Sequence, residues 1–167
     1  MSEFVMSSTN ESRFLWTDAY AQGYGPMDAA HQEFVECVDA LIHAADDEVA
    51  ERLEAFARHA RAHFGAEDEW MTSTDFPARE CHMNEHTAVL HSVQQVQELV
   101  AQGNYEIARD LGRELARWFP GHTDYLDSAL SHWMCKQKLG GKPVIIRRDI
   151  RSGKLDELLA NEHGVRE

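Results

Sequence analysis

Two stretches of the chain carry most of its structural information: HFGAEDEWM at residues 63–71 and HMNEH at residues 82–86. The first places an imidazole, His63, four residues before a carboxylate, Glu67. The second places two imidazoles, His82 and His86, at the same interval. Residues four apart share one face of an α-helix, so each stretch predicts a pair of side chains that point the same way. Two such pairs predict a metal site inside a helix bundle, with ligands on the faces of two helices.

Further potential ligands lie on both sides of these stretches. The complete series contains five imidazoles and two carboxylates: His31, His63, Glu67, His82, His86, His122 and Asp127. Seven ligands are too many for one tetrahedral zinc ion. Nitrogen and oxygen donors in this number suit two adjacent ions of a metal such as iron.

Spacing alone leaves two of these choices open. His59 lies four residues before His63, so it shares that helix face and is a rival ligand. His122 and Asp127 are five residues apart, which is about 140° around a straight α-helix. The interval therefore does not favour Asp127 over Asp124.

The fold follows from the apolar pattern around these residues. Apolar positions recur at helical spacing in four segments, at about residues 28–45, 47–72, 77–102 and 105–134. Asp28 is the expected N-cap of the first segment. The pair Pro120-Gly121 predicts a kink or break one residue before His122. Four long helices with short turns predict an all-α fold, an antiparallel up-down four-helix bundle.

The 167 residues are expected to form one folded domain with two extensions. Residues 1–12 are polar, lack a hydrophobic period and are predicted to be disordered. The bundle is expected over residues 13–135. Its first part, residues 13–27, is an aromatic arm that packs over the body and contains Phe14, Trp16, Tyr20 and Tyr24. Residues 136–167 form a basic C-terminal extension, with eight Lys or Arg and five Asp or Glu; it is a solvated tail or a docking segment for a protein partner.

Charge and composition exclude several classes of function. The formal net charge of −13 disfavours binding to nucleic acid or to anionic membranes. No apolar run approaches the roughly 20 residues that span a bilayer, so membrane insertion is not expected. The N-terminus lacks the apolar core of a secretory signal. Three widely separated cysteines argue against a disulfide framework and indicate the cytoplasm.

Sequence motifs of other kinds of active or binding site are absent. The chain contains no His-Glu-x-x-His, no glycine-rich phosphate loop and no Gly-x-Ser-x-Gly. Glu-x-x-His is also absent, which excludes the carboxylate-rich site of ferritin-like bundles. The predicted site is therefore rich in imidazole and low in negative charge.

These residues resemble the hemerythrin family, in its bacterial single-domain form. The similarity extends over residues 13–134 and rests on the following matches: Trp16, DAAH at 28–31, HFGAEDEWM at 63–71, HMNEH at 82–86, and WFPGH at 118–122 with Asp127. All seven potential ligands occur in the family's order, and the resemblance selects His63 over His59 and Asp127 over Asp124.

The resemblance implies a non-haem centre of two iron ions. Three histidines would hold one iron: His82, His86 and His122. Two would hold the other and leave one coordination position open: His31 and His63. Two carboxylates would bridge the irons beside an oxo or hydroxo group: Glu67 and Asp127. The family binds O2 reversibly at the open position, and anions such as azide when oxidised, which implies oxygen storage, delivery or sensing. The alternative is a redox enzyme, a peroxidase, an oxidase or an NO-reducing centre, at the same site.

The resemblance also implies an apolar O2 pocket. Phe64, Trp118 and Phe119 match it, and their position beside ligands is equally typical of core packing. Thr123 departs from the pattern, because the family usually has a branched aliphatic residue there. A hydroxyl at this position is expected to donate to a bound ligand or to admit water, and so to shorten the life of the O2 adduct.

Overall fold

The computed structural model describes residues 11–141, and every α-helix in that range belongs to the bundle. The helices are α1 (Gly25–Ile42), α2 (Val49–Ser73), α3 (Arg79–Ala101), α4 (Glu106–His122) and α5 (Ser128–Leu139), with short turns η1 (Asp18–Tyr20) and η2 (Thr123–Asp127). No strand occurs between residues 11 and 141. The predicted disorder of the N-terminus falls almost wholly on residues 1–10, and most of the basic extension falls on residues 142–167; both ranges lie outside the described residues.

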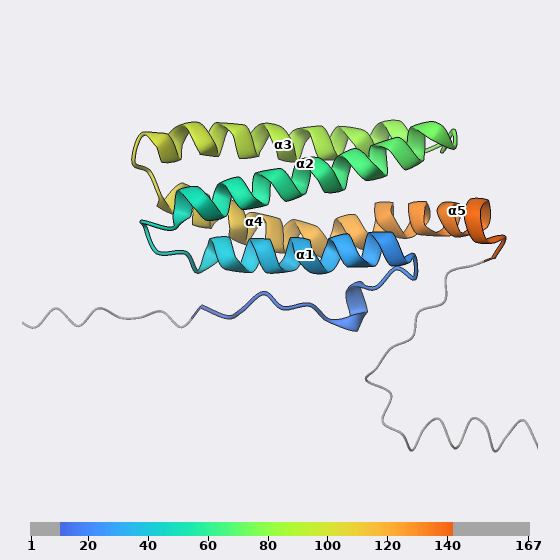
Figure 1. Ribbon diagram of the computed structural model, residues 1–167, viewed down its shortest axis with the longest axis horizontal. Helices are drawn as coiled ribbons and strands as arrows, with labels where there is room; N and C mark the ends of the chain where they lie inside the picture. Colours follow the sequence, from blue (N-terminus) through green and yellow to red (C-terminus); the bar gives the residue numbers. More distant parts are fainter. Residues whose placement is uncertain (1–10, 142–167) are drawn as a thin grey trace, which may run out of the picture.

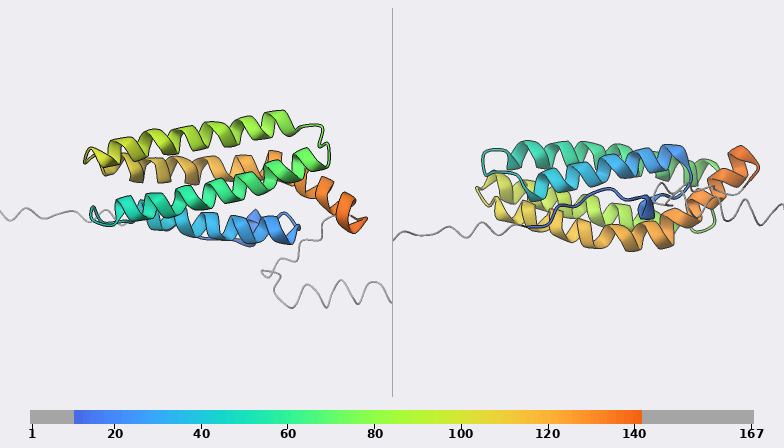
Figure 2. Two further views of the ribbon diagram at one scale, coloured as in Figure 1. Left: turned by 45° about the horizontal axis from the view of Figure 1, so that its top comes forward. Right: turned by 90° about the horizontal axis from the view of Figure 1, so that it is seen from below.

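The helices run up and down in chain order (Figures 1 and 2). Helices α1, α2 and α3 form three columns of the bundle, and α4, η2 and α5 follow one another as the fourth. The all-α prediction and the four-helix bundle are thereby confirmed. None of the described helices is long and apolar enough to cross a membrane.

The fourth column bends at a different residue from the one expected. The chain stays α-helical through Pro120 as far as His122, and the irregular turn is the π-helical η2 that follows. In that turn the Ser128 amide donates to the Thr123 carbonyl, five residues earlier. Pro120 lacks an N–H and so removes the helical bond to the Ala116 carbonyl, but the chain stays helical past this point. The predicted break thus becomes a π-bulge placed after the histidine.

The start of α1 also differs from its prediction. The helix begins at Gly25, and Asp28 lies inside its first turn. The Asp28 carboxylate accepts the amides of Gln22 at 2.6 Å and Gly23 at 3.0 Å. The side chain therefore holds the preceding loop against the helix, because a carboxylate stabilises unpaired amides wherever they point at it. Pro26, one residue inside the helix, is the stronger start signal.

Two apolar clusters fill the bundle and leave a polar layer between them. The larger contains Phe34, Leu53, Phe56 and Phe119, and the smaller, toward α5, contains Met27 and other sulfur-containing and aromatic side chains. On α1 the order is Met27, His31, Phe34, so a potential ligand stands between the two clusters. The apolar clusters exclude water on either side of the polar layer.

Helices α1 and α4 approach closely at Gly112. A methyl group built on this glycine would lie 2.8 Å from Cγ1 of Ile42. Only hydrogen fits at this contact without movement of the isoleucine. The close approach brings the α4 side chains near those of α1, including Phe119 and Phe34, whose rings stack at 4.9 Å between centroids.

The aromatic arm packs on this side of the bundle, as predicted. Its chain crosses the molecule beside α1 and α4 (Figure 2). Phe14 and Tyr20 contact the ring of Phe119, and Tyr24 contacts Trp70 edge to face at 5.3 Å. Aromatic edge contacts of this kind add about 0.5–1.5 kcal/mol each beyond the area they bury.

Candidate metal centre

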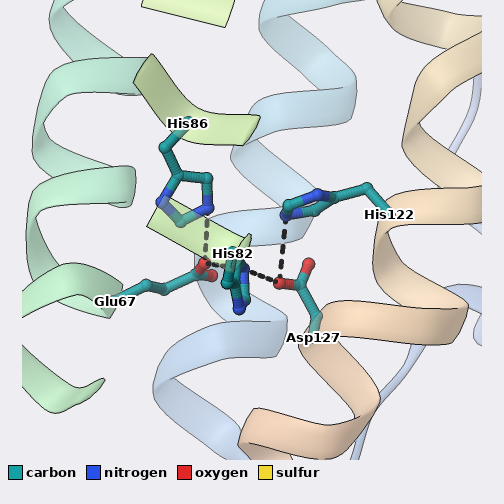
Figure 3. Close-up of side chains that lie close together, drawn as sticks. All are labelled: Glu67, His82, His86, His122 and Asp127. Carbon is teal, nitrogen blue, oxygen red and sulfur yellow. Dashed lines mark ion pairs between the residues drawn. The ribbon is translucent and has the colours of Figure 1, made fainter. Parts of the chain in front are cut away.

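All seven predicted ligands lie in one buried layer, and each of the four columns of the bundle contributes to it. None of them is more than 6% exposed. They come from α1 (His31), α2 (His63 and Glu67), α3 (His82 and His86), α4 (His122) and η2 (Asp127). Donor atoms gather in two groups, within 4.8 Å of one another in each: one group contains Glu67, His82, His86, His122 and Asp127, and the other contains His31, His63 and Glu67. Figure 3 shows the first group.

Glu67 divides its two oxygens between these groups. Oε1 lies 2.9 Å from Nε2 of His63 and 3.6 Å from Nε2 of His31. Oε2 lies 3.4 Å from Nε2 of His82 and 3.2 Å from Nε2 of His86. One carboxylate therefore faces two imidazoles with one oxygen and two others with the second.

Asp127 is divided in the same way. Its Oδ2 lies 3.0 Å from Nε2 of His31, while Oδ1 lies 3.0 Å from Nε2 of His82 and 3.2 Å from Nε2 of His122. Together the two carboxylates separate the imidazoles into a group of two and a group of three. The two-imidazole group is His31 and His63; the three-imidazole group is His82, His86 and His122.

The π-helical turn explains why Asp127 faces the site. A turn closed by hydrogen bonds between residues five apart brings such residues over one another, which a regular α-helix does not. His122 and Asp127 are separated by this interval across η2. Asp124, the alternative carboxylate, is exposed on the outside of the same turn. The geometry of the turn, rather than the spacing, selects the buried carboxylate.

The other open choice, between His63 and His59, concerns two side chains that reach to different depths. His63 reaches the carboxylates, whereas the His59 ring lies 5.2 Å from that of His63 and outside both donor groups. Nδ1 of His59 lies 3.6 Å from a carboxylate oxygen of Glu33 instead. Burial, and repulsion by the neighbouring His63, lower the pKa of His59 to about 4. His59 is thus a neutral imidazole behind the site.

Two carboxylates missed in the sequence orient imidazoles from behind. Nδ1 of His86 donates to Asp68 at 2.7 Å, and Nδ1 of His122 donates to Glu85 at 2.7 Å. A carboxylate accepts only, so it fixes the proton on Nδ1 and leaves the Nε2 lone pair directed at the site. Each carboxylate neighbours a ligand in the chain, Asp68 after Glu67 and Glu85 before His86, and that adjacency is the only signal the sequence offers.

Burial and charge together determine the protonation of the site in the absence of metal. Burial opposes the charged form of every group, but the surrounding imidazoles outweigh it and lower the pKa values of Glu67 and Asp127. In return, contacts with the two carboxylates raise the pKa values of His31 and His82 to about 9, against the effect of burial. Two imidazolium groups therefore balance two carboxylates in the metal-free protein.

The donor set fits a metal pair. The contacts of His31, His82 and both Asp127 oxygens are close but are not aligned as hydrogen bonds, so these buried atoms have no hydrogen-bond partner within residues 11–141. Buried polar atoms without such partners are rare in folded proteins and imply a missing ion or water. Imidazole nitrogens and carboxylate oxygens that converge on two points provide lone pairs for two cations.

Aromatic rings surround the two imidazole groups differently. Phe64 stacks on the His86 ring at 4.2 Å, and Trp118 stacks on the His122 ring at 4.2 Å, so both cover the three-imidazole group. Phe64 also lies 5.2 Å from the His63 ring and so contacts both groups. Phe119 meets the His31 ring edge to face at 5.4 Å on the two-imidazole side. Phe34, which the sequence indicated only as a core residue, joins it there, 6.1 Å from His63.

Thr123 is fully buried, and its hydroxyl is hydrogen-bonded to the helix backbone. Oγ1 donates to the carbonyls of Phe119 and Pro120, both at 3.1 Å. A hydroxyl has one proton, and the helix backbone already accepts it. Donation to a ligand, which the sequence suggested, would require the hydroxyl to leave these carbonyls.

Comparison with known proteins identifies the family. The family model described as hemerythrin HHE cation binding domain matches residues 22–131. A bacteriohemerythrin from Ralstonia nicotianae (strain ATCC BAA-1114 / GMI1000) is 34% identical over 122 residues, which cover 73% of this chain and 89% of that protein. No solved structure matches significantly. The buried layer of imidazoles and carboxylates, the bundle that holds it and these two matches together show that the chain belongs to the hemerythrin family.

Proposed function

We propose that this protein holds two iron ions in the buried layer and binds O2 reversibly there, for oxygen storage, delivery or sensing. The observation that carries the proposal is the division of the carboxylate oxygens: Glu67 and Asp127 each offer one oxygen to each imidazole group. Two carboxylates divided in this way would hold two cations, and nitrogen and oxygen donors suit iron.

The two metal positions are unequal, and the inequality provides the ligand site. One position has three imidazoles and two carboxylate oxygens, and the other has only His31 and His63 with two carboxylate oxygens. Iron in the poorer position would have a coordination site left for O2, which is the chemistry that the metal pair supplies when bound. The relative's printed name, bacteriohemerythrin, agrees with this assignment.

The protein's own part is to exclude water and protons from the two-imidazole side. Phe34 and Phe119 present their rings beside His31 and His63 and are at most 1% exposed. The Thr123 hydroxyl is engaged with backbone carbonyls, so it does not supply a proton. An apolar enclosure favours release of intact O2 over proton-dependent redox chemistry, and this favours a carrier over an enzyme.

The absorption spectrum of the reduced protein tests the proposal, with iron counted per chain. We expect two irons per chain and a visible band that appears in air and disappears when O2 is removed. Immediate conversion to the oxidised form with release of peroxide would support the redox enzyme instead. One iron or none per chain would refute the assignment.

A matched pair of variants locates the metals. Asp127→Asn is expected to lower the iron content to at most one per chain, whereas Asp124→Asn, at the exposed alternative, should retain two. Binding of azide to the oxidised protein, the cytoplasmic location and a protein partner for residues 136–167 are further expectations that accompany this function.

A further inference from the structure

The Phe119 ring lies between the metal layer and the aromatic arm. On its inner side it meets the His31 ring edge to face at 5.4 Å. On its outer side it meets Tyr20 at 5.2 Å and Phe14 at 6.0 Å, again edge to face. Phe119 is only 1% exposed, and two of the rings that surround it belong to the arm. The cover over the two-imidazole side is therefore completed by a segment from outside the bundle.

The arm is attached to α1 through one buried carboxylate. Asp39 is 4% exposed, and it accepts the Arg13 guanidinium at both Nε (2.7 Å) and Nη2, and the Phe14 amide at 2.8 Å. Burial opposes its charge, but these donors outweigh burial and lower the pKa of Asp39. Charge-assisted bonds from a guanidinium are among the stronger polar contacts in proteins.

Other contacts fasten the arm on either side of its aromatic part. Before it, Glu11 pairs with Arg113 of α4 through two contacts, at 2.7 and 3.1 Å. After it, Ser131 of α5 donates to the Gln22 carbonyl at 2.7 Å. The arm is thus tied to both α1 and the fourth column, across the side where Phe119 lies.

A hollow lies beneath the arm next to this attachment. It has a volume of about 470 Å³ and is lined by arm residues and by the α1 residues Val35, Glu36, Asp39 and Ala40. A water molecule or a small ligand fits easily in such a space. Movement of the arm would connect the hollow with the outer side of the Phe119 ring.

We propose that the aromatic arm is a strap whose attachment to Asp39 controls how fast small ligands and water reach the His31–His63 side of the centre. The inference rests on the proposed function only in requiring metal there. Phe14, Tyr20 and Asp39 are positioning residues, which act through Phe119. Release of Arg13 or Asp39 would free the outer side of Phe119 and raise the population of open arm about tenfold or more, the usual consequence of losing a hydrogen bond to a charged group.

Two measurements test the strap, on Arg13→Gln, Asp39→Asn and Tyr20→Leu. Hydrogen exchange at the Phe14 amide, in the metal-free and the iron-loaded protein, reports opening of the arm. Stopped-flow binding of azide to the oxidised iron-loaded protein reports access to the centre. Arg61→Gln is the control, because Arg61 forms an exposed pair with Glu54 on α2, at 4.0 Å.

In the Arg13 and Asp39 variants we expect hydrogen exchange at the Phe14 amide to be at least tenfold faster. Azide binding should be at least several-fold faster, and the iron content should be unchanged. Tyr20→Leu should accelerate azide binding but have a smaller effect on hydrogen exchange at the Phe14 amide, because this variant keeps the attachment to Asp39. The Arg61 control should match the wild type in both measurements.

Either of two results would overturn the proposal. Unchanged exchange in Arg13→Gln and Asp39→Asn would show that Asp39 does not hold the arm. Faster exchange with unchanged azide binding would show that ligands take another route, such as the groove of about 360 Å³ between α3 and α4 beside Trp118. Ala88→Trp fills that groove, so this variant should then slow azide binding. One iron or none per chain in wild-type protein would refute the iron proposal instead, and hydrogen exchange at the Phe14 amide would then still test whether Asp39 holds the arm.

Discussion

Metal loading is expected to displace about two protons from this protein near pH 7.5. In the metal-free site, contacts with Glu67 and Asp127 raise the pKa values of His31 and His82 to about 9. Both imidazoles are therefore protonated at pH 7.5, and a metal must replace both protons because it binds the neutral ring. Five imidazoles with ordinary pKa values near 6.5 would together carry only about half a proton at this pH.

The same protons make the stability of the metal-free protein depend on pH. A pKa that is higher in the folded than in the unfolded chain stabilises the fold fully below about pH 6.5, and that contribution disappears as the pH rises through 9. With nearly two protons held by the folded protein alone, the free energy of unfolding should fall by about 2 kcal/mol per pH unit near pH 8. Metal-loaded protein should lack this slope, since its imidazoles hold metal over the whole range.

Calorimetry and denaturant unfolding check these values. Anaerobic Fe²⁺ titrations at pH 7.5, in buffers with different ionisation enthalpies, count the protons released. His59→Gln is the control: the pKa of His59 is lowered to about 4, so this residue carries no proton at pH 7.5 and its loss should not change the count. A release near half a proton, or a flat pH dependence of metal-free stability, would refute the reasoning.

Three further substitutions and one control substitution test the packing and the supporting contacts. Gly112→Ala should destabilise the metal-free protein by about 1–3 kcal/mol in urea unfolding, because the new methyl displaces Ile42; Gly65→Ala, which meets no atom within 4 Å, should be neutral or add up to about 1 kcal/mol. Glu85→Gln should weaken metal binding about 10- to 100-fold in competition with a chelator, and an unchanged affinity would mean that packing alone orients the imidazole it supports. Thr123→Val should cost about 1 kcal/mol of stability and leave the lifetime of the O2 adduct unaltered, since its proton faces the backbone; a longer-lived adduct would contradict this.

The local spacing of apolar residues predicted most of the fold. Helical periodicity predicted four helices close to their observed ranges, because each amphipathic stripe must find an apolar partner and short turns permit only antiparallel neighbours. The boundaries were less accurate: α1 begins three residues before Asp28, and the bend follows His122 rather than preceding it. Both boundaries depend on which backbone amides find hydrogen-bond acceptors, and groups distant in the sequence influence which acceptors are available.

The sequence by itself predicted which residues the buried polar layer contains. Pairs four residues apart, such as His63 with Glu67, are brought together by the helix alone, so their chemistry can be read without a structure. The absence of Glu-x-x-His likewise defined the site as rich in imidazole.

Residue spacing left open how these residues are used, and only the tertiary structure shows the physical reason for the arrangement that the resemblance implies. The π-helical turn aims Asp127 inward and leaves Asp124 outside, although spacing does not separate them. Packing between helices placed Glu85 behind His122 and the aromatic arm over Phe119, contacts between residues 37 and about a hundred positions apart in the chain. Such contacts have no periodic signature, because they arise where separate helices meet, and the division of the carboxylate oxygens between two and three imidazoles is of the same kind.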